Sequence, residues 1–391
     1  MKRINEKLDI MREELRGRNA RVMIIGLGSV GSYLLDYLMS AGDPGMEIRV
    51  VGRNGEKLQS DVNIVRVASM IRGQNRSRIS ICDHVDLNDI SRIASAIDEY
   101  RPDIIVNSSR AYPGLKYGSI SWQNIRAYGI WAPLAIKYTK NIMEAYEKTG
   151  SDAVVINTSY SDAVIPWLKG AGMAYPDFGS GNVNHLIPRI KMAVAQECHI
   201  KDDWNIDVTF AVAHFHDVVI SKEGHTEGLD MLIDIRYQGE KLAVKLSDIF
   251  TKCRIPMPVD SKRNQMNASS NFEIIMAVLS AVRDEERRKL HCPGAFGEIG
   301  GYPVIVDGCK ERVEAYICED YFTLDEMRKK NRESIYLDGI EDVRAGVLTY
   351  TDELLDKVQT AFGVKLMKQV PFDEIENAAD YIIKEIIEKN R

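Results

Sequence analysis

The sequence lacks the features that mark membrane, nucleic-acid-binding and disulfide-stabilised proteins. It has no run of the roughly 18 apolar residues that a membrane span needs, and its charged first segment lacks the apolar stretch of a signal peptide. The net charge is −6, and no group of Lys and Arg residues is interleaved with aromatics, so nucleic acid is not an expected partner. The six cysteines form no C-x-x-C pair, which argues against a zinc ribbon or a disulfide framework. We expect a cytoplasmic protein with free thiols that contacts neither membrane nor nucleic acid.

The first half of the chain alternates short apolar runs with amphipathic segments. With 391 residues, 45% of them hydrophobic, the chain can bury a large core in about two or three domains. The repetition predicts a parallel sheet covered by helices on both faces, which is a doubly wound Rossmann arrangement. Strands are expected at 21–25, 47–51, 78–82, 103–107 and 153–157, and helical patterns at 33–39, 90–100 and 122–148. Ahead of them, an amphipathic helix with Ile4, Leu8, Met11 and Leu15 on one face packs on its own domain or on a second subunit.

The second half mixes helices with alternating, strand-like stretches, which predicts an α+β domain. A Thr323/Glu326 capping box opens one of the helices expected near the end of the chain. We therefore divide the chain into a Rossmann domain at 1–180 and an α+β domain at 181–391. Within the latter we expect a helix ending near 196, a strand at 207–215, alternating stretches at 231–246 and 312–321, and a helix at 272–290.

A glycine-rich turn follows the first expected strand directly and leads into a helix. Gly26, Gly28 and Gly31 give the pattern G-x-G-x-x-G, with Ser29 and Val30 between the last two glycines. The first glycine allows the tight turn, the second lets the backbone approach a pyrophosphate, and the third lets helix and strand pack closely. Because strand, turn and helix occur in this order, the turn predicts a dinucleotide site.

The end of the second strand bears on the choice between NAD and NADP. An acidic residue there would accept hydrogen bonds from the ribose hydroxyls and repel a 2′-phosphate. This chain has Gly52 followed by Arg53, with Lys57 one turn further on. Since an arginine suits a phosphate, we expect NADP, with NAD as the alternative.

The order of these elements resembles that of the lactate/malate dehydrogenase superfamily, which also includes the family 4 glycosidases. The similar segments are the loop from Gly114 to Asn124 after Asn107, the sequence TSYSD around Ser159, the crossing sequence GSGNVNHLIPR, and AVAHFHD with His214 and His216. The resemblance implies that Asn107, Ser108 and Ser159 contact the cofactor. It also implies a homodimer or homotetramer.

Several positions depart from the pattern of that family. Its hydroxy-acid dehydrogenases clamp the substrate carboxylate with arginines and orient the catalytic histidine with an aspartate. The matching positions here are Tyr117 (beside Lys116), Ile187 and Asn184. We therefore expect a small-molecule substrate other than simple lactate or malate.

The resemblance implies that either His214 or His216 is the proton shuttle. Asn184 is expected to orient the imidazole, and the alternative is that Asp217 orients it in place of Asn184. The residues expected to contact substrate are Lys116, Asn124, Tyr160, His185 and Arg189. A second arrangement brings His185, His214, His216, Asp217 and His225 together around a divalent metal. The glycosidases, however, use a Cys in the segment matching 182–185, and this chain has none there. No metal is expected.

The sequence thus predicts an NAD(P)-dependent oxidoreductase that acts on a hydroxy or amino compound, with a histidine as proton shuttle. Two alternatives stay open. One is a family 4-like hydrolase that uses NAD and a divalent metal, and the other is a non-catalytic NADP sensor.

Overall fold

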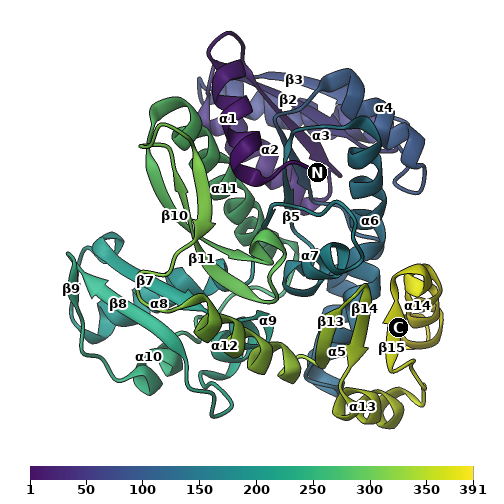
Figure 1. Cartoon of the computed structure of the whole chain (residues 1–391), viewed down its shortest axis with the longest axis vertical. Coiled ribbons are helices and arrows are strands. Elements are labelled where there is room, and N and C mark those ends of the chain that lie inside the picture. Colours follow the sequence, from purple (N-terminus) through teal and green to yellow (C-terminus); the bar gives the residue numbers. More distant parts are fainter. Residues whose placement is uncertain (391) are drawn as a thin grey trace.

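The computed structural model describes residues 1–390, without the side chains of Leu115, Lys116 and Ser119. The first half contains a six-stranded parallel sheet in the order β3-β2-β1-β4-β5-β6, with β2 and β3 at the top of Figure 1. This confirms the predicted Rossmann arrangement. The strands are β1 (Ala20–Ile25), β2 (Met46–Val51), β3 (Arg78–Cys82), β4 (Ile104–Asn107), β5 (Val154–Asn157) and β6 (Phe178–Gly179).

Helices cover both faces of this sheet because neighbouring strand residues point to opposite sides. In β1, Val22 and Ile24 belong to one buried cluster, while Met23 and Ile25 belong to another. The helices of this half are α1 (Ile4–Leu15), α2 (Ser29–Ala41), α3 (Gly55–Ile71), α4 (Ile90–Tyr100), α5 (Gly114–Asn124), α6 (Ala132–Thr149) and α7 (Ser161–Gly170). Within the described residues no helix is both long and apolar enough to cross a bilayer.

The first helix packs on its own chain, as one of the two expected arrangements requires. Leu8 and Met11 of α1 are buried in the same cluster as β1 and β2. Lys7 is also buried, and its ammonium pairs with the Asp177 carboxylate at 2.8 Å. A buried ion pair of this kind fixes the position of α1 more than it adds to stability.

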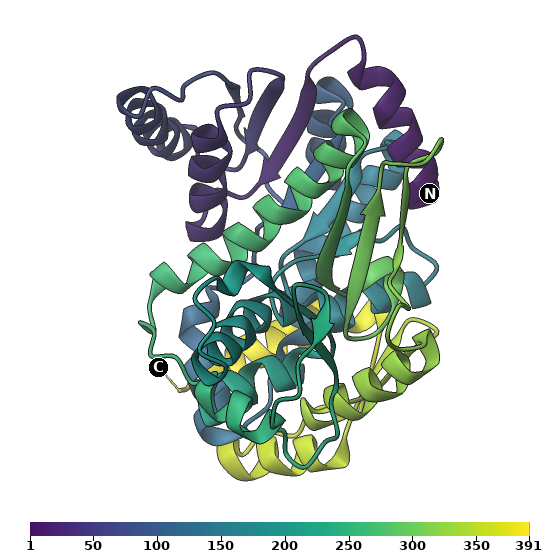
Figure 2. The same ribbon diagram turned by 90° about the vertical axis from the view of Figure 1, so that its left-hand side faces the viewer.

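The second half has three small antiparallel sheets with helices around them. The long helix α11 crosses from this half to pack beside α2 (Figure 2). The sheets are β7 (Ile206–Ala211), β8 (Leu232–Tyr237) and β9 (Glu240–Lys241); β10 (Arg287–Pro293), β11 (Gly301–Asp307) and β12 (Glu314–Ile317); and β13 (Ile340–Arg344), β14 (Val347–Tyr350) and β15 (Gln369–Pro371). The helices are α8 (Val183–Glu197), α9 (His214–Glu223), α10 (Leu246–Lys252), α11 (Asn264–Asp284), α12 (Leu324–Leu337), α13 (Asp352–Phe362) and α14 (Ile375–Ile382), and a π-helix, η6, spans Ile383–Ile387.

Four expected elements differ from the structure. The strand expected at 207–215 ends at Ala211, and α9 begins at His214. The helix expected at 272–290 is α11, which ends at Asp284 because β10 begins three residues later. The single pattern at 122–148 is divided between α5 and α6. The end of the chain, expected to be helical, also contains the sheet β13-β14-β15, whose short strands lie between helices.

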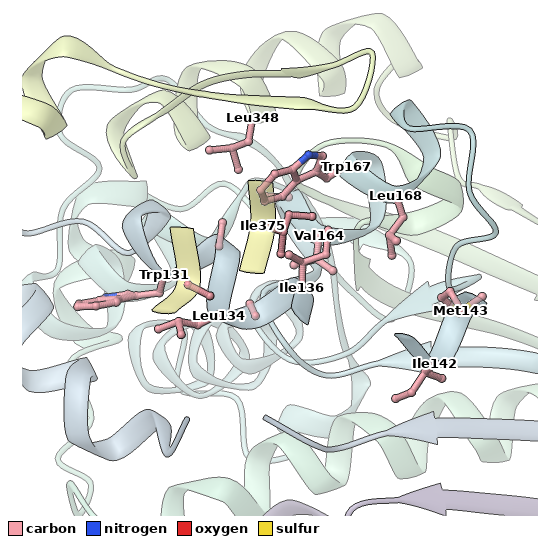
Figure 3. Close-up of a cluster of buried hydrophobic side chains, with 14 of the residues drawn as sticks. Trp131, Leu134, Ile136, Ile142, Met143, Val164, Trp167, Leu168, Leu348 and Ile375 are labelled. Atoms are coloured by element: carbon pink, nitrogen blue, oxygen red, sulfur yellow. The ribbon is translucent and has the colours of Figure 1, made fainter. Parts of the chain in front are cut away.

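The C-terminal segment packs back onto the Rossmann half. Leu348 of β14 and Ile375 of α14 lie in one buried cluster with Trp131 and Trp167 (Figure 3). The indole nitrogen of Trp167 also donates to the carbonyl of Gly346 at 3.0 Å. The end of α12 lies close to the carboxyl end of β5, because Asp338 at that end accepts a hydrogen bond from Tyr160. The division at residue 180 stays a prediction.

Candidate functional site

The glycine-rich turn has the geometry that its three glycines predict. Gly26 has φ +90°, and a Cβ at Gly31 would lie 2.2 Å from the carbonyl oxygen of Gly26. By contrast, no atom lies within 4 Å of the position that a Cβ would take at Gly28. The first and third glycines are therefore required by the fold itself, whereas the second leaves open space in front of the first turn of α2.

A cleft of about 720 Å³ opens in front of this turn. Of the predicted cofactor residues, it is lined by Gly26, Gly28, Ser29, Val30, Arg53 and Ser108. The hydroxyl of Ser108 donates to the carbonyl of Gly26 at 2.6 Å, so it supports the turn. Asn264 donates from α11 to the hydroxyl of Ser29 at 2.5 Å and connects the second half to the cleft.

Asn107, predicted to contact the cofactor, lies behind the cleft. It is buried, and its amide group donates to Thr139 and Asn157. Its carbonyl oxygen accepts from the backbone and hydroxyl of Ser109. The structure does not bring Asn107 into the cleft, because both ends of its side chain are already hydrogen-bonded in the interior.

The end of the cleft near β2 contains cations and carboxylates. Arg53 is 76% exposed, and its guanidinium lies 3.8 Å from the Asp86 carboxylate. Lys57 pairs with Asp61 at 2.7 Å one turn along α3. Such exposed ion pairs are weak, so both cations are able to change partners.

A second pocket of about 240 Å³ adjoins the cleft. Arg110, Gly114, His185, Arg263 and Asn267 line both spaces, which therefore form one continuous site. The predicted residues Ser159 and Tyr160 line the second pocket after β5. One face of α9 lines it as well, through His214, Asp217, Val218, Ser221 and Lys222, whose spacing is that of residues on one side of a helix.

His214 is held at the wall of this pocket by a buried carboxylate. Its Nδ1 atom lies 2.8 Å from Oδ2 of Asp338, which is fully buried at the end of α12. Because a carboxylate only accepts hydrogen bonds, Nδ1 carries the proton. Among the described residues no hydrogen-bond partner occupies Nε2 of His214. Burial lowers the pKa of His214, but the charge of Asp338 and its hydrogen bond outweigh burial and leave the pKa raised.

The Asp338 carboxylate accepts two further hydrogen bonds. The hydroxyl of Tyr160 donates to Oδ2 at 2.7 Å, and the backbone N–H of Tyr128 donates to Oδ1 at 2.7 Å. Tyr160 takes a left-handed conformation, with φ +44° and ψ +50°, immediately before α7. Non-glycine residues rarely adopt this conformation, so a contact of Tyr160 is needed to maintain it. The hydrogen bond to Asp338 is such a contact.

A second carboxylate supports the backbone of His214. Asp162, fully buried in the first turn of α7, accepts from the backbone N–H of His214 at 3.0 Å and from the side chain of Asn182. The carboxylate thus lies at the start of α9, where a negative charge is stabilising. Burial nevertheless raises the pKa of Asp162 to about 6.

Two predictions for the catalytic group are corrected by the structure. His214 and His216 would share a face only in an extended strand; in α9, which begins where the expected strand should continue, the two side chains diverge, because residues two apart in a helix do not face the same side. His216 is fully buried and bonds to Ser334 and the carbonyl of Thr226. Asn184 does not orient a histidine, because its amide group donates to Ser270 and Glu273.

The predicted substrate residues are not all brought together. His185 and Tyr160 line the pocket, whereas Asn124 only bonds to Ile120 within its own helix. Arg189 is 4% exposed and donates to the carbonyls of Cys253 and Ile255, so it holds the chain and does not face the pocket. The side chain of Lys116 lies outside the described residues.

The five residues of the alternative metal arrangement do not come together as one group: His185, His214 and Asp217 line the pocket, whereas His216 is buried away from it and His225 lies at the surface. Across the described residues, the one group of His, Cys, Asp and Glu with metal-ligand spacing is Glu223, His225 and Glu227 at the surface. Both of its carboxylates already pair with Arg126. His185 is half-buried, and its Nε2 atom is shielded from solvent without a hydrogen-bond partner in the described structure. Burial lowers the pKa of His185 to about 3, so the ring is neutral.

Comparisons with known proteins agree with the fold. The model of the NAD dependent epimerase/dehydratase family matches residues 22–188. No curated protein sequence matches the chain. Solved structures with a similar fold are the malate dehydrogenase of Cryptosporidium parvum (14% identity, 82% of this chain and 98% of that chain, TM-score 0.53) and that of Aeropyrum pernix (16% identity, 81% and 97%, TM-score 0.53). The lactate dehydrogenase of Cryptosporidium parvum, solved with lactic acid and nicotinamide adenine dinucleotide, is similar as well (16% identity, 81% and 95%, TM-score 0.52).

At these identities the similarity establishes the fold. The chain has the architecture of the lactate and malate dehydrogenases, as the sequence resemblance predicts.

Proposed function

We propose that this protein is an NAD(P)-dependent oxidoreductase that transfers hydride between a nicotinamide and a hydroxy or amino compound, with His214 as the proton shuttle. The observation that carries the proposal is the position of His214. It is fixed by Asp338 at the wall of a pocket that is continuous with the cleft in front of the glycine-rich turn.

The cleft fits a dinucleotide. The open space at Gly28 admits a pyrophosphate close to the backbone, and the amides at the start of α2 face it with the positive end of the helix dipole. His185 lines both the cleft and the pocket, so its unpartnered Nε2 would help to hold the nicotinamide end of a dinucleotide. Ser108 lines the cleft, and Ser159 lines the pocket.

We propose NADP as the preferred cofactor, with NAD as an alternative. Gly52 offers no carboxylate to repel a 2′-phosphate, and Arg53 is exposed with only a long contact to Asp86. A phosphate brings two charges and several acceptors, so it competes well for this guanidinium and for Lys57. Asp61 and Asp86 line the same end of the cleft and weaken the preference.

The mechanism uses the His214 pair. A bound nicotinamide supplies the group that takes or gives the hydride. His214 receives or returns the proton of the substrate oxygen or nitrogen at Nε2, the atom that is free of protein partners. Asp338 fixes the tautomer and stabilises the protonated ring, and Tyr160 keeps Asp338 in place.

The pocket favours a substrate different from lactate or malate. Tyr117 lies in α5 and contacts Trp131, with ring centroids 4.8 Å apart, at one position where the resemblance places an arginine. Ile187, at the other such position, is buried in the core of the second half. The small-molecule substrate thus meets aromatic surfaces beside the His214 pair. A homodimer or homotetramer stays a prediction.

The experiment is a binding and turnover assay with NADPH and NADH and a set of hydroxy and amino compounds. Hydride transfer predicts that nicotinamide absorbance changes in proportion to the product formed. This absorbance change should be lost in His214→Asn. It should persist in the control His84→Asn, which alters an exposed histidine. Hydrolysis without net change in the cofactor would instead indicate the glycosidase-like reaction. Tight NADPH binding without any turnover would indicate a sensor.

A further inference from the structure

Asp217 is a buried carboxyl group in the pocket that the proposed mechanism does not use. The residue is 9% exposed, and it lies three residues after His214 on the same face of α9. Within the described structure its carboxylate accepts no hydrogen bond, and its nearest ion-pair contact is Nδ1 of His185 at 3.9 Å. Since His185 is neutral, that contact supplies no charge. A buried carboxylate without a partner is costly, so a ligand group is the natural partner.

The same pocket also offers positive charge. Arg263 and Lys222 both line it, and no ion pair of either side chain is found among the described residues. Lys222 lies over the ring of Trp122, 5.0 Å from its centre, while Arg263 stands where the pocket meets the cleft. The pocket therefore combines one unpaired carboxylate with two cations that have no carboxylate partners.

Aromatic groups complete the pocket wall. Tyr117, Tyr128 and Trp131 line it, and the indole nitrogen of Trp131 is buried without a hydrogen-bond partner in the described structure. Aromatic faces attract ammonium groups, and a free indole N–H is suited to an anionic oxygen. Both features suit a ligand that carries charges of both signs.

We infer that Asp217 binds an amino group, and that the substrate of this site is an amine that also carries an anionic group, as amino acids do. The inference rests on the proposed function and narrows it from hydroxy or amino compounds to amines. Arg263 and Lys222 bind the anionic end of the substrate.

The reaction balances as an amine oxidation. The carbon that bears the nitrogen loses its hydrogen as hydride, that is, together with the two electrons of the C–H bond. The oxidised nicotinamide dinucleotide is the acceptor of this hydride. The nitrogen loses one proton to Nε2 of His214, and a C=N double bond forms. Water then releases a carbonyl compound and the free amine. In the reverse direction the imine is reduced.

The first test compares matched ligands that differ only at the reacting group. Phenylalanine and 3-phenyllactate, alanine and lactate, and the N-methyl amino acids are titrated by calorimetry into protein saturated with NADP or NAD. The same compounds are then assayed for oxidation. The inference predicts that the amino compound of at least one pair binds about ten times more tightly than its hydroxy counterpart. In the reverse assay, a keto acid should oxidise NADPH only when an amine is added.

The second test uses Asp217→Asn, with the surface variant Asp248→Asn as its control. Asp217→Asn should raise KM for the amine at least tenfold while kcat changes much less, and Asp217→Glu should recover part of the affinity. Burial raises the pKa of Asp217 to about 7, and the charge of Asp162 raises it as well. The positive charges of His214, Arg189 and Arg263 lower this pKa but do not outweigh burial. The KM for the amine should therefore fall as pH rises through about 7, and this dependence should vanish in Asp217→Asn.

The outcomes separate this inference from the proposed function. Turnover of hydroxy acids with no binding or reaction of their amino counterparts would overturn the inference and leave the oxidoreductase intact. An unchanged KM in Asp217→Asn would also overturn it. Absence of hydride transfer with every compound would overturn both.

Discussion

Nδ1 of His214 lies 2.8 Å from Oδ2 of Asp338, although 124 positions separate these residues in the sequence. The carboxylate is fully buried and also accepts from Tyr160 and the backbone of Tyr128. The pair therefore has one defined geometry, which fixes the histidine tautomer and leaves Nε2 for the substrate.

Replacing Asp338 should remove the proton-shuttle chemistry. Asp338→Asn removes the negative charge that stabilises the protonated imidazole of His214. Burial, which favours the neutral ring, then dominates, so the pKa of His214 falls. Nitrogen NMR of labelled histidine measures this fall directly. In turnover, kcat should drop on the order of 10²- to 10⁴-fold. Asp342→Asn, which alters a carboxylate bound to exposed Arg332, should change neither value. An unchanged His214 titration in Asp338→Asn would contradict the pairing.

Tyr160→Phe should raise the pKa of His214 further. The substitution removes one donor from Asp338, and a carboxylate with fewer donors attracts the imidazolium more strongly. Tyr128→Phe is a matched control, because Tyr128 bonds to Asp338 through its backbone. The same NMR titration distinguishes the two variants. If both tyrosine variants gave equal shifts, the role of the Tyr160 hydroxyl would be refuted.

Two alanine substitutions in the glycine-rich turn should have opposite effects. Gly28→Ala places a methyl group in open space, so the free protein should keep its stability while dinucleotide binding falls. Gly31→Ala forces a Cβ to within 2.2 Å of the Gly26 carbonyl and should lower the thermal midpoint. Calorimetry of the free protein and titration with NADPH measure both effects. Full NADPH affinity in Gly28→Ala would place the dinucleotide elsewhere.

Arg53→Ala tests the cofactor preference. Loss of a charge-assisted bond to the 2′-phosphate should weaken NADP binding by roughly 1.5–3 kcal/mol and leave NAD binding unchanged. Arg78→Ala removes another exposed cation from a neighbouring strand and serves as the control. If the Arg53 variant bound NADP as tightly as the native protein, the preference would have to be abandoned.

The stability of the fold should fall on acidification because buried histidines must stay neutral. Burial lowers the pKa of His291 to about 3, and its Nε2 accepts from the backbone of Phe210 at 3.2 Å. Below pH ~6.5 the unfolded chain therefore binds a proton that the folded chain refuses, so stability rises with pH in this window by up to ~1.4 kcal/mol per pH unit for such a group. The free energy of unfolding, measured with urea between about pH 3 and pH 6.5, should depend less steeply on pH in His291→Gln than in the native protein. Exposed His84→Gln should keep the native slope.

The sequence was sufficient for features that depend on local pattern. The sequence predicts the glycine-rich turn, five of the six strands of the Rossmann sheet and the Thr323/Glu326 capping box. Each depends on residues close together in the chain, whose spacing reflects the period of a strand or the geometry of a turn.

The sequence was insufficient where the site joins distant segments. Asp338 follows α12 and precedes Gly339, so it looks like an ordinary residue at a helix end. Nothing near it indicates a contact with His214. A strand through His214 would also place His216 on the same face, whereas the helix α9 separates the two side chains, because a strand and a helix place alternate residues differently. The resemblance points to Asn184, whereas in this chain Asp338 supplies a carboxylate to His214.

The most direct test of hydride transfer at this site works even while the substrate is unidentified. The protein is incubated with NADPH carrying deuterium at C4 of the nicotinamide and with a small-molecule extract of cells, and mass spectrometry follows the label. Hydride transfer predicts that deuterium appears on carbon in one compound or a few related ones, and that His214→Asn and Asp338→Asn abolish the transfer. NADPH bound in the cleft with no deuterium in any compound, for either face of the ring, would contradict the proposed function.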